Sequence, residues 1–389
     1  MQAPASVFSQ ITDTLYPGEF ARCAQRFPNR RPTRGLTVYD HFLALCFGQL
    51  TYRESLRDIV ICLKSKTSLL YHLGFRGHIT RTNLAYANQH RDWRLFQAVA
   101  EVLMRRAARL YAPTSADTEL PQMAFALDAS MISLSLQLFP WGYYSRSRKA
   151  ALKLHLLLSL RGNLPAWGAL TEAHFPDQKI LAQIPVQAGA CYIMDRGYVD
   201  FVRLHRIHEA NGFFVVRCVR QVSFSRLTAR PVDKAEGLRA DQTVRLKSPR
   251  SKKAFPQLLR RITIYNPEHK ISLMLLTNNF ELTATVIAEL YRRRWQVELF
   301  FKWIKQHLKI RSFYGHTENA VRCQVWSAIS VYLMVAILKK ELGIKKSLYE
   351  ILQVLSVNAF EQTSAHKLLT ETKIDDESND SQIPLIINT

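Results

Sequence analysis

The stretch "ACYIMDRGYVDFVRLHRIHEANGFFVVRCV", residues 190–219, decides the fold. Its opening run is apolar through Met194 and predicts a short buried strand that ends at Asp195. Residues 198–212 carry apolar side chains at helical spacing and end on Gly212, which suits a helix C-cap. The closing "FFVVRCV" predicts a second buried strand. Strand, helix and strand in this order are typical of an α/β sheet of mixed direction with helices on its faces.

The segments on either side extend this pattern. Three strand-like runs precede it, "MAFALDASMISLSL" (123–136), "ALKLHLLLSL" (151–160) and "PAWGALTEA" (165–173). Residues 221–282 are strand-like again but more cationic, and "NPEHK" (266–270) is typical of a hairpin turn. We expect one long helix over residues 282–310 and a buried apolar helix over residues 320–342.

The first part of the chain, up to residue 118, shows helical spacing, and "APTSADTELPQ" (112–122) predicts a linker after it. A helix beginning at Ser55 is expected to break near Gly74, and a second helix capped by Thr82 follows. The polar residues on that second helix are Asn83, Asn88, His90 and Arg91. The pair predicts a helix-turn-helix whose second helix lies in a DNA major groove, with an ordinary helical bundle as the alternative.

Charge and cysteine usage narrow the class of partner. The 389 residues include 53 Lys and Arg against 31 Asp and Glu, a net charge of +22. Such a surplus favours nucleic acid, although a ribosome-associated or lipid-binding protein would show the same balance. The six scattered cysteines argue against a zinc site or disulfides. The sequence has no secretory signal and no apolar run of membrane-spanning length, which predicts a cytoplasmic protein without a membrane partner.

Three acids stand out by their placement. Asp128 lies inside a predicted strand, where a charge is costly unless it is paired or used. Asp195 follows a buried strand, at the sheet edge where ligands bind in open α/β sheets. Glu298 stands among cations on the predicted long helix. Each has an ordinary reading as well, since a strand-end Asp often caps a helix and Glu298 could simply pair with Arg294.

The helical stretch "YRRRWQVELFFKWIKQ", residues 291–306, places its acid with its cations. At about 100° per residue, one face of roughly 80° holds the polar side chains. These are Tyr291, Arg294, Glu298, Lys302 and Lys305. The opposite, apolar stripe consists of Val297, Phe300, Phe301, Ile304 and Leu308. Anionic DNA would explain the cations, and a metal ion that bridges the acid and a phosphate would explain both.

The chain resembles the bacterial transposases of the insertion-sequence-four group. Tyr291, Arg294, Glu298 and Lys305 reproduce the family's Tyr-Arg-Glu-Lys signature at its spacing. "LDASMI" (127–132) and "MDRGYVDF" (194–201) resemble its first and second aspartate blocks. The resemblance covers about residues 119–340, and the N-terminal part resembles the helical domain that precedes the catalytic core in one branch of the family.

This resemblance implies a fold and a domain plan. A ribonuclease-H-like mixed sheet with flanking helices would span residues 119–340, interrupted by a β-rich insertion at about 221–282. An N-terminal all-α DNA-binding domain would take residues 1–118. The remaining residues, 341–389, would form a C-terminal helix and an acidic, disordered tail.

The resemblance also implies the site and its chemistry. Asp128, Asp195 and Glu298 would form a DDE triad that holds two Mg²⁺ ions, with Mn²⁺ as a substitute. One ion would activate a water or a 3′-hydroxyl, and the other would stabilise the leaving oxygen. The expected DNA contacts are Tyr291, Arg294, Lys302, Lys305, Arg196 and Tyr198. Aromatic candidates for stacking on an unpaired base are Phe224, Phe255, Tyr265 and Trp295, although a place in the core is the more common one for such residues.

The function implied is that of a DNA transposase. It would bind the inverted-repeat ends of an insertion sequence, cleave them and join their 3′-hydroxyls to target DNA, as a homodimer on double-stranded DNA near the bacterial nucleoid. Two alternatives are a catalytically retired DNA-binding protein and a ribonuclease-H-like nuclease without strand transfer. The intact acids argue against the first, and the Tyr-Arg-Glu-Lys spacing argues against the second.

Overall fold

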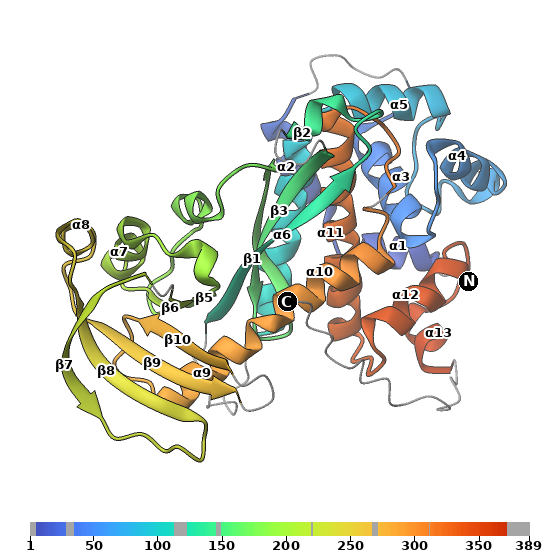
Figure 1. The fold of residues 1–389 in the computed structure, drawn as a ribbon. Coiled ribbons are helices and arrows are strands. Elements are labelled where there is room, and N and C mark those ends of the chain that lie inside the picture. Colours follow the sequence, from blue (N-terminus) through green and yellow to red (C-terminus); the bar gives the residue numbers. More distant parts are fainter. Residues whose placement is uncertain are drawn as a thin grey trace.

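The computed structural model describes residues 5–28, 35–112, 123–144, 149–218, 221–266, 271–310 and 312–371. Every regular element described before residue 113 is helical, as predicted. These elements are α1 (Val7–Thr12), α2 (Pro17–Arg26), α3 (Val38–Leu50), α4 (Leu56–Lys64), the 3-10 turn η1 (Thr67–Leu69), α5 (Arg81–His90) and α6 (Arg94–Leu110). Of these, α1, α3, α5 and α6 pack against the later helix α11 (Glu318–Glu341) (Figure 1).

The described strands form one ten-stranded mixed sheet. The strands are β1 (Ala124–Leu134), β2 (Tyr143–Tyr144), β3 (Lys149–Ser159), β4 (Leu164–Glu172), β5 (Cys191–Met194), β6 (Phe213–Arg217), β7 (Phe224–Arg230), β8 (Leu238–Leu246), β9 (Leu259–Asn266) and β10 (Ile271–Thr277). Their order is β2-β3-β1-β5-β6-β10-β9-β8-β7, and β4 also pairs with β3. β1, β5 and β6 are parallel, whereas the strands on both sides of them are antiparallel.

The β-rich segment continues this sheet. β10 pairs with β6 in antiparallel register, and β9, β8 and β7 follow outward from it. The predicted hairpin pairing of β9 with β10 is therefore confirmed, while most of the turn itself lies outside the described residues. The yellow strands in Figure 1 thus belong to the same sheet as the green ones.

Helices cover both faces of the sheet because apolar side chains alternate along its strands. The later helices are α7 (Phe201–Glu209), α8 (Pro249–Ala254), α9 (Ala284–Arg293), α10 (Trp295–His307), α11, α12 (Leu348–Val357) and α13 (Ala365–Glu371), with 3-10 turns η2 (Pro140–Gly142), η3 (Asp177–Ala182) and η4 (Arg196–Tyr198). One face packs on α9, α10 and α11, in a core that continues into the N-terminal helices. The other face packs on η3, η4 and α7.

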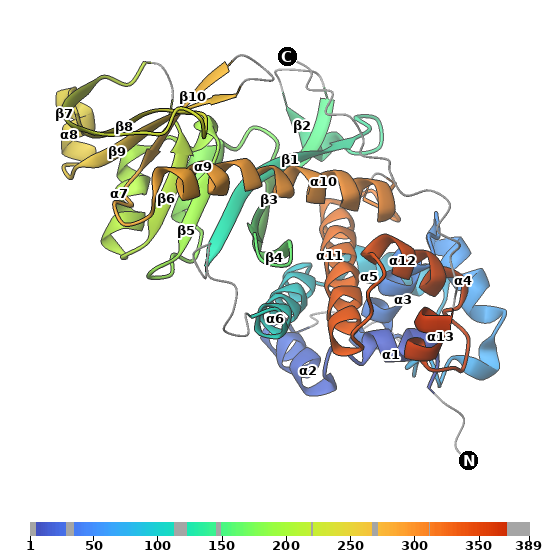
Figure 2. The same cartoon turned by 90° about the horizontal axis from the view of Figure 1, so that it is seen from below.

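The long helix predicted over residues 282–310 is interrupted. α9 ends and α10 begins at Arg294, where two backbone hydrogen bonds span three residues instead of four. Arg294 N donates to Tyr291 O at 3.2 Å, and Val297 N donates to Arg294 O at 3.1 Å. The helix tightens there without a change of course, so α9 and α10 run end to end along the sheet (Figure 2).

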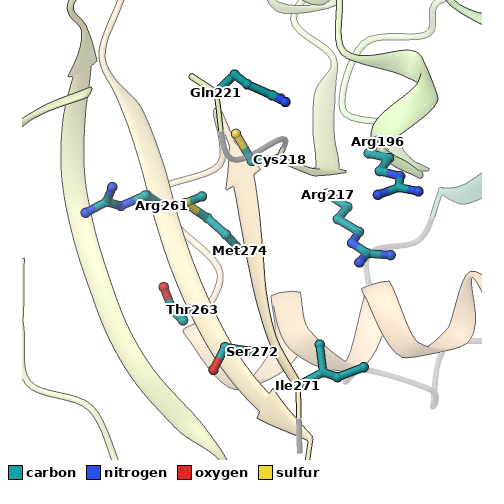
Figure 3. A pocket seen from close by; sticks show the side chains of 9 residues that line it. All are labelled: Arg196, Arg217, Cys218, Gln221, Arg261, Thr263, Ile271, Ser272 and Met274. Carbon is teal, nitrogen blue, oxygen red and sulfur yellow. The ribbon is translucent and has the colours of Figure 1, made fainter. Parts of the chain in front are cut away.

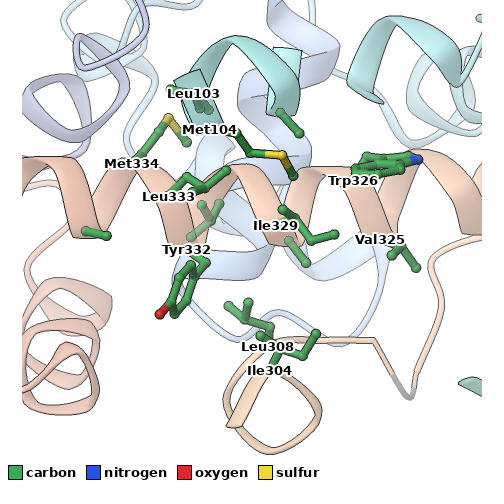
Figure 4. Packing of buried hydrophobic residues seen from close by; sticks show 14 of the residues in the cluster. Leu103, Met104, Ile304, Leu308, Val325, Trp326, Ile329, Tyr332, Leu333 and Met334 are labelled. Carbon is green, nitrogen blue, oxygen red and sulfur yellow. The ribbon is translucent and has the colours of Figure 1, made fainter. Parts of the chain in front are cut away.

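The apolar helix predicted over residues 320–342 is α11, and it is confirmed as a core element. Trp326, Ile329 and Leu333 lie among side chains of α6 and α10 (Figure 4). Among the described helices, only α11 is long and apolar enough to cross a membrane, and its most apolar stretch is entirely buried inside the protein. The prediction that no apolar run reaches that length was therefore wrong, but the burial is that of a core helix.

The predicted helix-turn-helix is not formed by α4 and α5. Residues 65–80 separate the two helices, whereas the motif joins its helices by a turn of about three or four residues. The cap of α5 is Thr80, whose Oγ1 accepts from Asn83 N at 3.1 Å, and not Thr82.

Two of the polar residues expected in a DNA groove are instead buried. Asn88 is 2% exposed and its Oδ1 lies 2.7 Å from His41 Nε2. Arg91 is 3% exposed and donates to the carbonyl oxygens of Leu36 and Thr37. Both side chains hold the helices together, so neither can contact DNA from where it lies.

Two smaller predictions concern helix and chain ends. Asn211 rather than Gly212 takes the left-handed position after α7, with φ 56°, and Gly212 N closes the helix onto Ile207 O at 2.9 Å. In the C-terminal part, α12 and α13 fold back toward the first helices, where Val7 N donates to Glu361 O at 2.9 Å. The acidic tail beyond residue 371 lies outside the described residues.

Candidate active site

The strand register brings three charged side chains to one sheet edge. Leu127 of β1 pairs with Met194 of β5, so Asp128 and Asp195 are the next residues on two adjacent parallel strands. Met194 pairs with Val216 of β6, which places Arg217 beside Asp195 in turn. Because side chains alternate between the faces of a sheet, all three lie on the face that α9 and α10 cover.

Asp128 is held in a largely desolvated position. Its side chain is 22% exposed, and its Oδ1 accepts from Ala129 N at 2.8 Å. Burial raises the pKa of Asp128 to about 6, although the nearby Arg294 opposes this shift. Glu298 and Asp195 raise it further, because a second negative charge disfavours ionisation. Asp128 therefore lies close enough to both other predicted acids to be affected by their charge.

Arg294 links two of the acids at the junction of α9 and α10. Its Nη2 donates to Glu298 Oε1 at 2.7 Å, and its Nη1 lies 3.5 Å from Asp128 Oδ2. The Arg294 side chain is only 13% exposed. The sequence allowed a simple i,i+4 pair of Arg294 with Glu298. The structure contains this pair, and the Arg294 guanidinium also reaches Asp128 on β1.

Asp195 is held from the other side of the site. Tyr291 Oη donates to Asp195 Oδ1 at 3.1 Å, and Arg217 Nη1 lies 3.9 Å from the same oxygen. Burial, with a contribution from Asp195, raises the pKa of Tyr291 to about 12, so the phenol stays protonated and can donate. Tyr291 thus positions an acid in this structure.

The cations farther along α10 have different surroundings. Lys305 Nζ donates to Ser130 Oγ at 2.6 Å, and Ser130 lies two residues after Asp128 on the same face of β1. Lys302 is exposed to solvent. The predicted apolar stripe of the helix is confirmed, because all five of its residues are buried.

The second-aspartate block gives one exposed and one buried side chain. Arg196 is exposed at the start of η4. Tyr198 is 2% exposed, so the prediction that it contacts DNA was wrong. Its hydroxyl has no hydrogen-bond partner within the described part of the chain, and burial together with Asp128 raises its pKa well above the usual value. Tyr198 therefore packs beneath the acids.

Sequence reasoning missed Arg217 and the contact that Asp177 makes. Arg217 ends the run "FFVVR" just as Asp195 follows "CYIM", and this equivalent place on a neighbouring strand was the available signal. Asp177 Oδ1 accepts from Lys153 Nζ at 2.9 Å, across the sheet edge from η4. No sequence spacing relates those two residues, since the contact depends on the tertiary fold.

A cationic hollow of about 640 Å³ adjoins the acids. It is lined by Arg196, Arg217, Cys218, Gln221, Arg261, Thr263, Ile271, Ser272 and Met274 (Figure 3). Among the described residues that line it, three are arginines and none carries a carboxylate. Since Arg217 also contacts Asp195, the hollow continues from the acids onto β9 and β10.

The aromatic candidates for stacking on a base differ in burial. Phe255 is 1% exposed and packs on Phe214 in the core, so it cannot stack on a base. Phe224 and Tyr265 are half-buried beneath arginines, and Trp295 is 39% exposed. Five basic residues of the β-rich segment are also exposed: Arg245, Lys247, Arg250, Lys252 and Lys253.

The acids suit a hard divalent cation by their chemistry. Asp128, Asp195 and Glu298 offer only carboxylate oxygens, which Mg²⁺ prefers. The guanidinium of Arg294 shows that a cation is held between Asp128 and Glu298. Within the described ranges, no three His, Cys, Asp or Glu side chains are close enough together to hold a metal ion. The three carboxylates therefore stand farther apart in this structure than the ligands of a bound metal ion would.

Comparison with known proteins gives the family. The transposase DDE domain matches residues 119–334, more than half of the chain, and the chain belongs to this family. A second family, described as a domain of unknown function (DUF4372), matches residues 4–76. DDE transposase domains use divalent metal ions, generally Mg²⁺.

The relatives are transposases that match over part of their length. A putative transposase, y4zB, of Sinorhizobium fredii is 38% identical over 197 residues, which cover 50% of this chain and 55% of that protein. A probable transposase for insertion sequence element IS5377 of Geobacillus stearothermophilus is 29% identical over 57% of this chain and 58% of that protein. The chain thus spans little more than half the length of these relatives. A structure of a piggyBac transposase synaptic complex with hairpin DNA has a TM-score of 0.43 at 8% identity over 94% of this chain and 79% of that one, too low to support an argument.

Proposed function

We propose that the protein is a DNA transposase of the insertion-sequence-four group. It binds the inverted-repeat ends of an insertion sequence, cleaves them in a metal-dependent hydrolysis and joins the 3′-hydroxyl ends to target DNA. The observation that carries the proposal is the meeting of Asp128, Asp195 and Glu298 around the junction of α9 and α10. The family match and the transposase relatives support the same activity.

In this proposal the acids hold two Mg²⁺ ions. When bound, the ions supply an activated oxygen nucleophile and stabilise the leaving oxygen. The chain's own residues fix the ligands: Tyr291 and Arg217 hold Asp195, and the backbone of β1 and β5 keeps Asp128 beside it. Glu298 lies on α10, so α10 must stay packed against β1 for the acids to act together.

DNA would lie along the cations next to the acids. Lys305 and Lys302 on α10, with Arg196 and Arg217 at the strand ends, are placed to contact phosphates. The hollow between η4 and β10 extends this surface, and its described lining includes three arginines. The high net positive charge strengthens the attraction to DNA.

The finer assignments belong to the same proposal. The order of the central strands, antiparallel on the β3 side and parallel across β1, β5 and β6, supports a ribonuclease-H-like core. The helices before residue 113 would form the N-terminal DNA-binding domain. Two copies would act together as a homodimer, because two transposon ends must be cut, and the place of action would be the bacterial nucleoid.

The test is cleavage and joining of end-containing DNA with Mg²⁺. Glu298→Gln removes a charge from the proposed site, and it should abolish cleavage while DNA binding persists. Glu289→Gln is the matched control and should leave cleavage intact, because the ion pairs that Glu289 of α9 makes within the described chain are with two exposed arginines, Arg292 and Arg293. Equal cleavage by wild type and Glu298→Gln would refute the assignment.

Two other outcomes would select the alternatives. Cleavage by the wild type without joining would identify a nuclease. Binding of the ends without any cleavage by the wild type would identify a retired DNA-binding protein.

A further inference from the structure

Arg294 occupies the place between two proposed metal ligands. Its two terminal nitrogens point to different acids, Glu298 at 2.7 Å and Asp128 at 3.5 Å. The neighbouring cations on the helix behave differently, because Arg292 and Arg293 both pair with the surface residue Glu289. Arg294 is therefore the cation of this cluster that bridges strand β1 and helix α10.

This bridge excludes a metal ion from the same place. A divalent ion shared by Asp128 and Glu298 would need the oxygens that now face the guanidinium. The guanidinium remains protonated at any ordinary pH, so it cannot yield its charge in place. It has to turn away, and its Nε has no hydrogen-bond partner within the described part of the chain to hold it back.

A DNA phosphate is the partner that can draw Arg294 away. Phosphate accepts two parallel bonds from a guanidinium, as a carboxylate does. The surrounding surface is cationic, with Lys305 on α10 and Arg217 at the end of β6, so a phosphodiester would be attracted to this point.

We propose that Arg294 blocks metal binding to Asp128 and Glu298 in the DNA-free protein by occupying their carboxylate oxygens. DNA draws the Arg294 side chain away, so that metal binding and DNA binding reinforce each other. This inference rests on the proposed metal site and adds its control. Binding of DNA raises the affinity for metal because the phosphate takes over Arg294. By linkage, the metal raises the affinity for DNA by the same factor.

The experiment measures Mn²⁺ binding to the full chain by electron paramagnetic resonance of the free ion, without and with a duplex that carries the transposon end. Without DNA, Arg294→Gln should bind Mn²⁺ at least about tenfold more tightly than the wild type. Arg293→Gln, which makes the same charge change one residue away, should bind like the wild type. With DNA, the wild type should gain about tenfold and Arg294→Gln little.

Further variants separate this inference from the proposed function. If Asp128→Asn and Glu298→Gln leave Mn²⁺ binding unchanged, the metal site itself fails. If they weaken binding but Arg294→Gln binds no more tightly than wild type, only the role of Arg294 is overturned. Arg294→Lys carries the test should the Gln variant not fold, since an ammonium cannot bridge both acids as a fork. Affinity equal to wild type in that variant would refute the inference.

Discussion

At the scale of single residues, the contacts of Tyr291 bear on two possible roles, a contact with a DNA phosphate and the positioning of an acid. The resemblance implied a phosphate contact, whereas the structure gives its hydroxyl to Asp195 at 3.1 Å and leaves the side chain 7% exposed. A buried donor that faces an acid acts through that acid. We infer that it positions Asp195, which also contacts Arg217.

Tyr291→Phe should slow DNA cleavage by about tenfold or more, because a hydrogen bond to a charged group contributes about 1.5–3 kcal/mol. The Kd for end DNA should stay unchanged, since Tyr291 is only 7% exposed and its hydroxyl is bonded to Asp195. Single-turnover cleavage and fluorescence anisotropy measure the two quantities. A variant that loses DNA affinity but cleaves normally once saturated would show that Tyr291 contacts phosphate instead.

Buried histidines make the stability of the fold depend on pH. His41 is fully buried beside Asn88, and burial, followed by the charge of Arg91, lowers its pKa to about 3. The unfolded chain takes up a proton near the ordinary pKa of 6.5, but the folded chain does not. The stabilisation is therefore complete above that pH and is lost as the pH falls toward 3.

The free energy of unfolding should be about 2 kcal/mol smaller at pH 5 than at pH 7 through His41 alone. His41→Gln keeps an amide donor for Asn88 but does not titrate, so its unfolding free energy should fall less over the same interval. Urea denaturation at the two pH values gives the comparison. An identical pH dependence in both proteins would show that His41 does not control it.

At the scale of elements, one buried ion pair joins the outer strands of the sheet. Arg260 of β9 and Asp241 of β8 are 4% and 5% exposed, and Arg260 makes bonds of 2.7 and 2.8 Å to the two carboxylate oxygens. Arg260 also donates to the carbonyl oxygen of Leu282, just before α9. The pair thus ties the outer sheet to the helix that leads to the acids.

Asp241→Ala should lower the free energy of unfolding by about 3–5 kcal/mol, because Arg260 would remain buried without its counter-charge. Asp233→Ala, in the exposed loop before β8, is the control and should change it by less than about 0.5 kcal/mol. Denaturation midpoints in urea test both. A small loss in Asp241→Ala would show that water reaches Arg260.

Sequence patterns predicted the elements better than their junctions. The alternating run around Asp128 and the apolar run before Asp195 both became strands, because local spacing determines which face is buried. The break at Arg294 has no signal in the sequence, since the apolar stripe continues in register from α9 into α10. Arg217 and Tyr198 were misjudged for another reason. Their surroundings are set by strand register and by packing from distant segments.

At the scale of the whole molecule, the helices before residue 113 and the later part of the chain share one core. Leu103 and Met104 of α6 pack against α11 (Figure 4), and Tyr111 Oη donates to Ala336 O at 3.0 Å. Asn319 Nδ2 donates to Asn88 O at 2.7 Å. The predicted boundary at residue 118 therefore separates two stretches of sequence that bury each other's apolar side chains.

Deletion of residues 1–118 should leave a protein that does not fold, because one face of α11 would lose its cover. Soluble expression and near-ultraviolet circular dichroism of the truncated and full chains give the comparison. A truncated chain that unfolds cooperatively at the wild-type temperature would show that residues 119–340 form an independent domain.

The pairing of β10 with β6 has a consequence for how such chains diverge. Beyond β10 the sheet continues through β9 and β8 to β7, the outermost described strand on that side, away from Asp195 and Asp128. The loops that join β7 to β8 and β8 to β9 can then lengthen or shorten without moving the acids, since the pairing of β1, β5 and β6 does not depend on them. Length variation among relatives should gather at that edge, while the spacing from β10 to Glu298 stays constant.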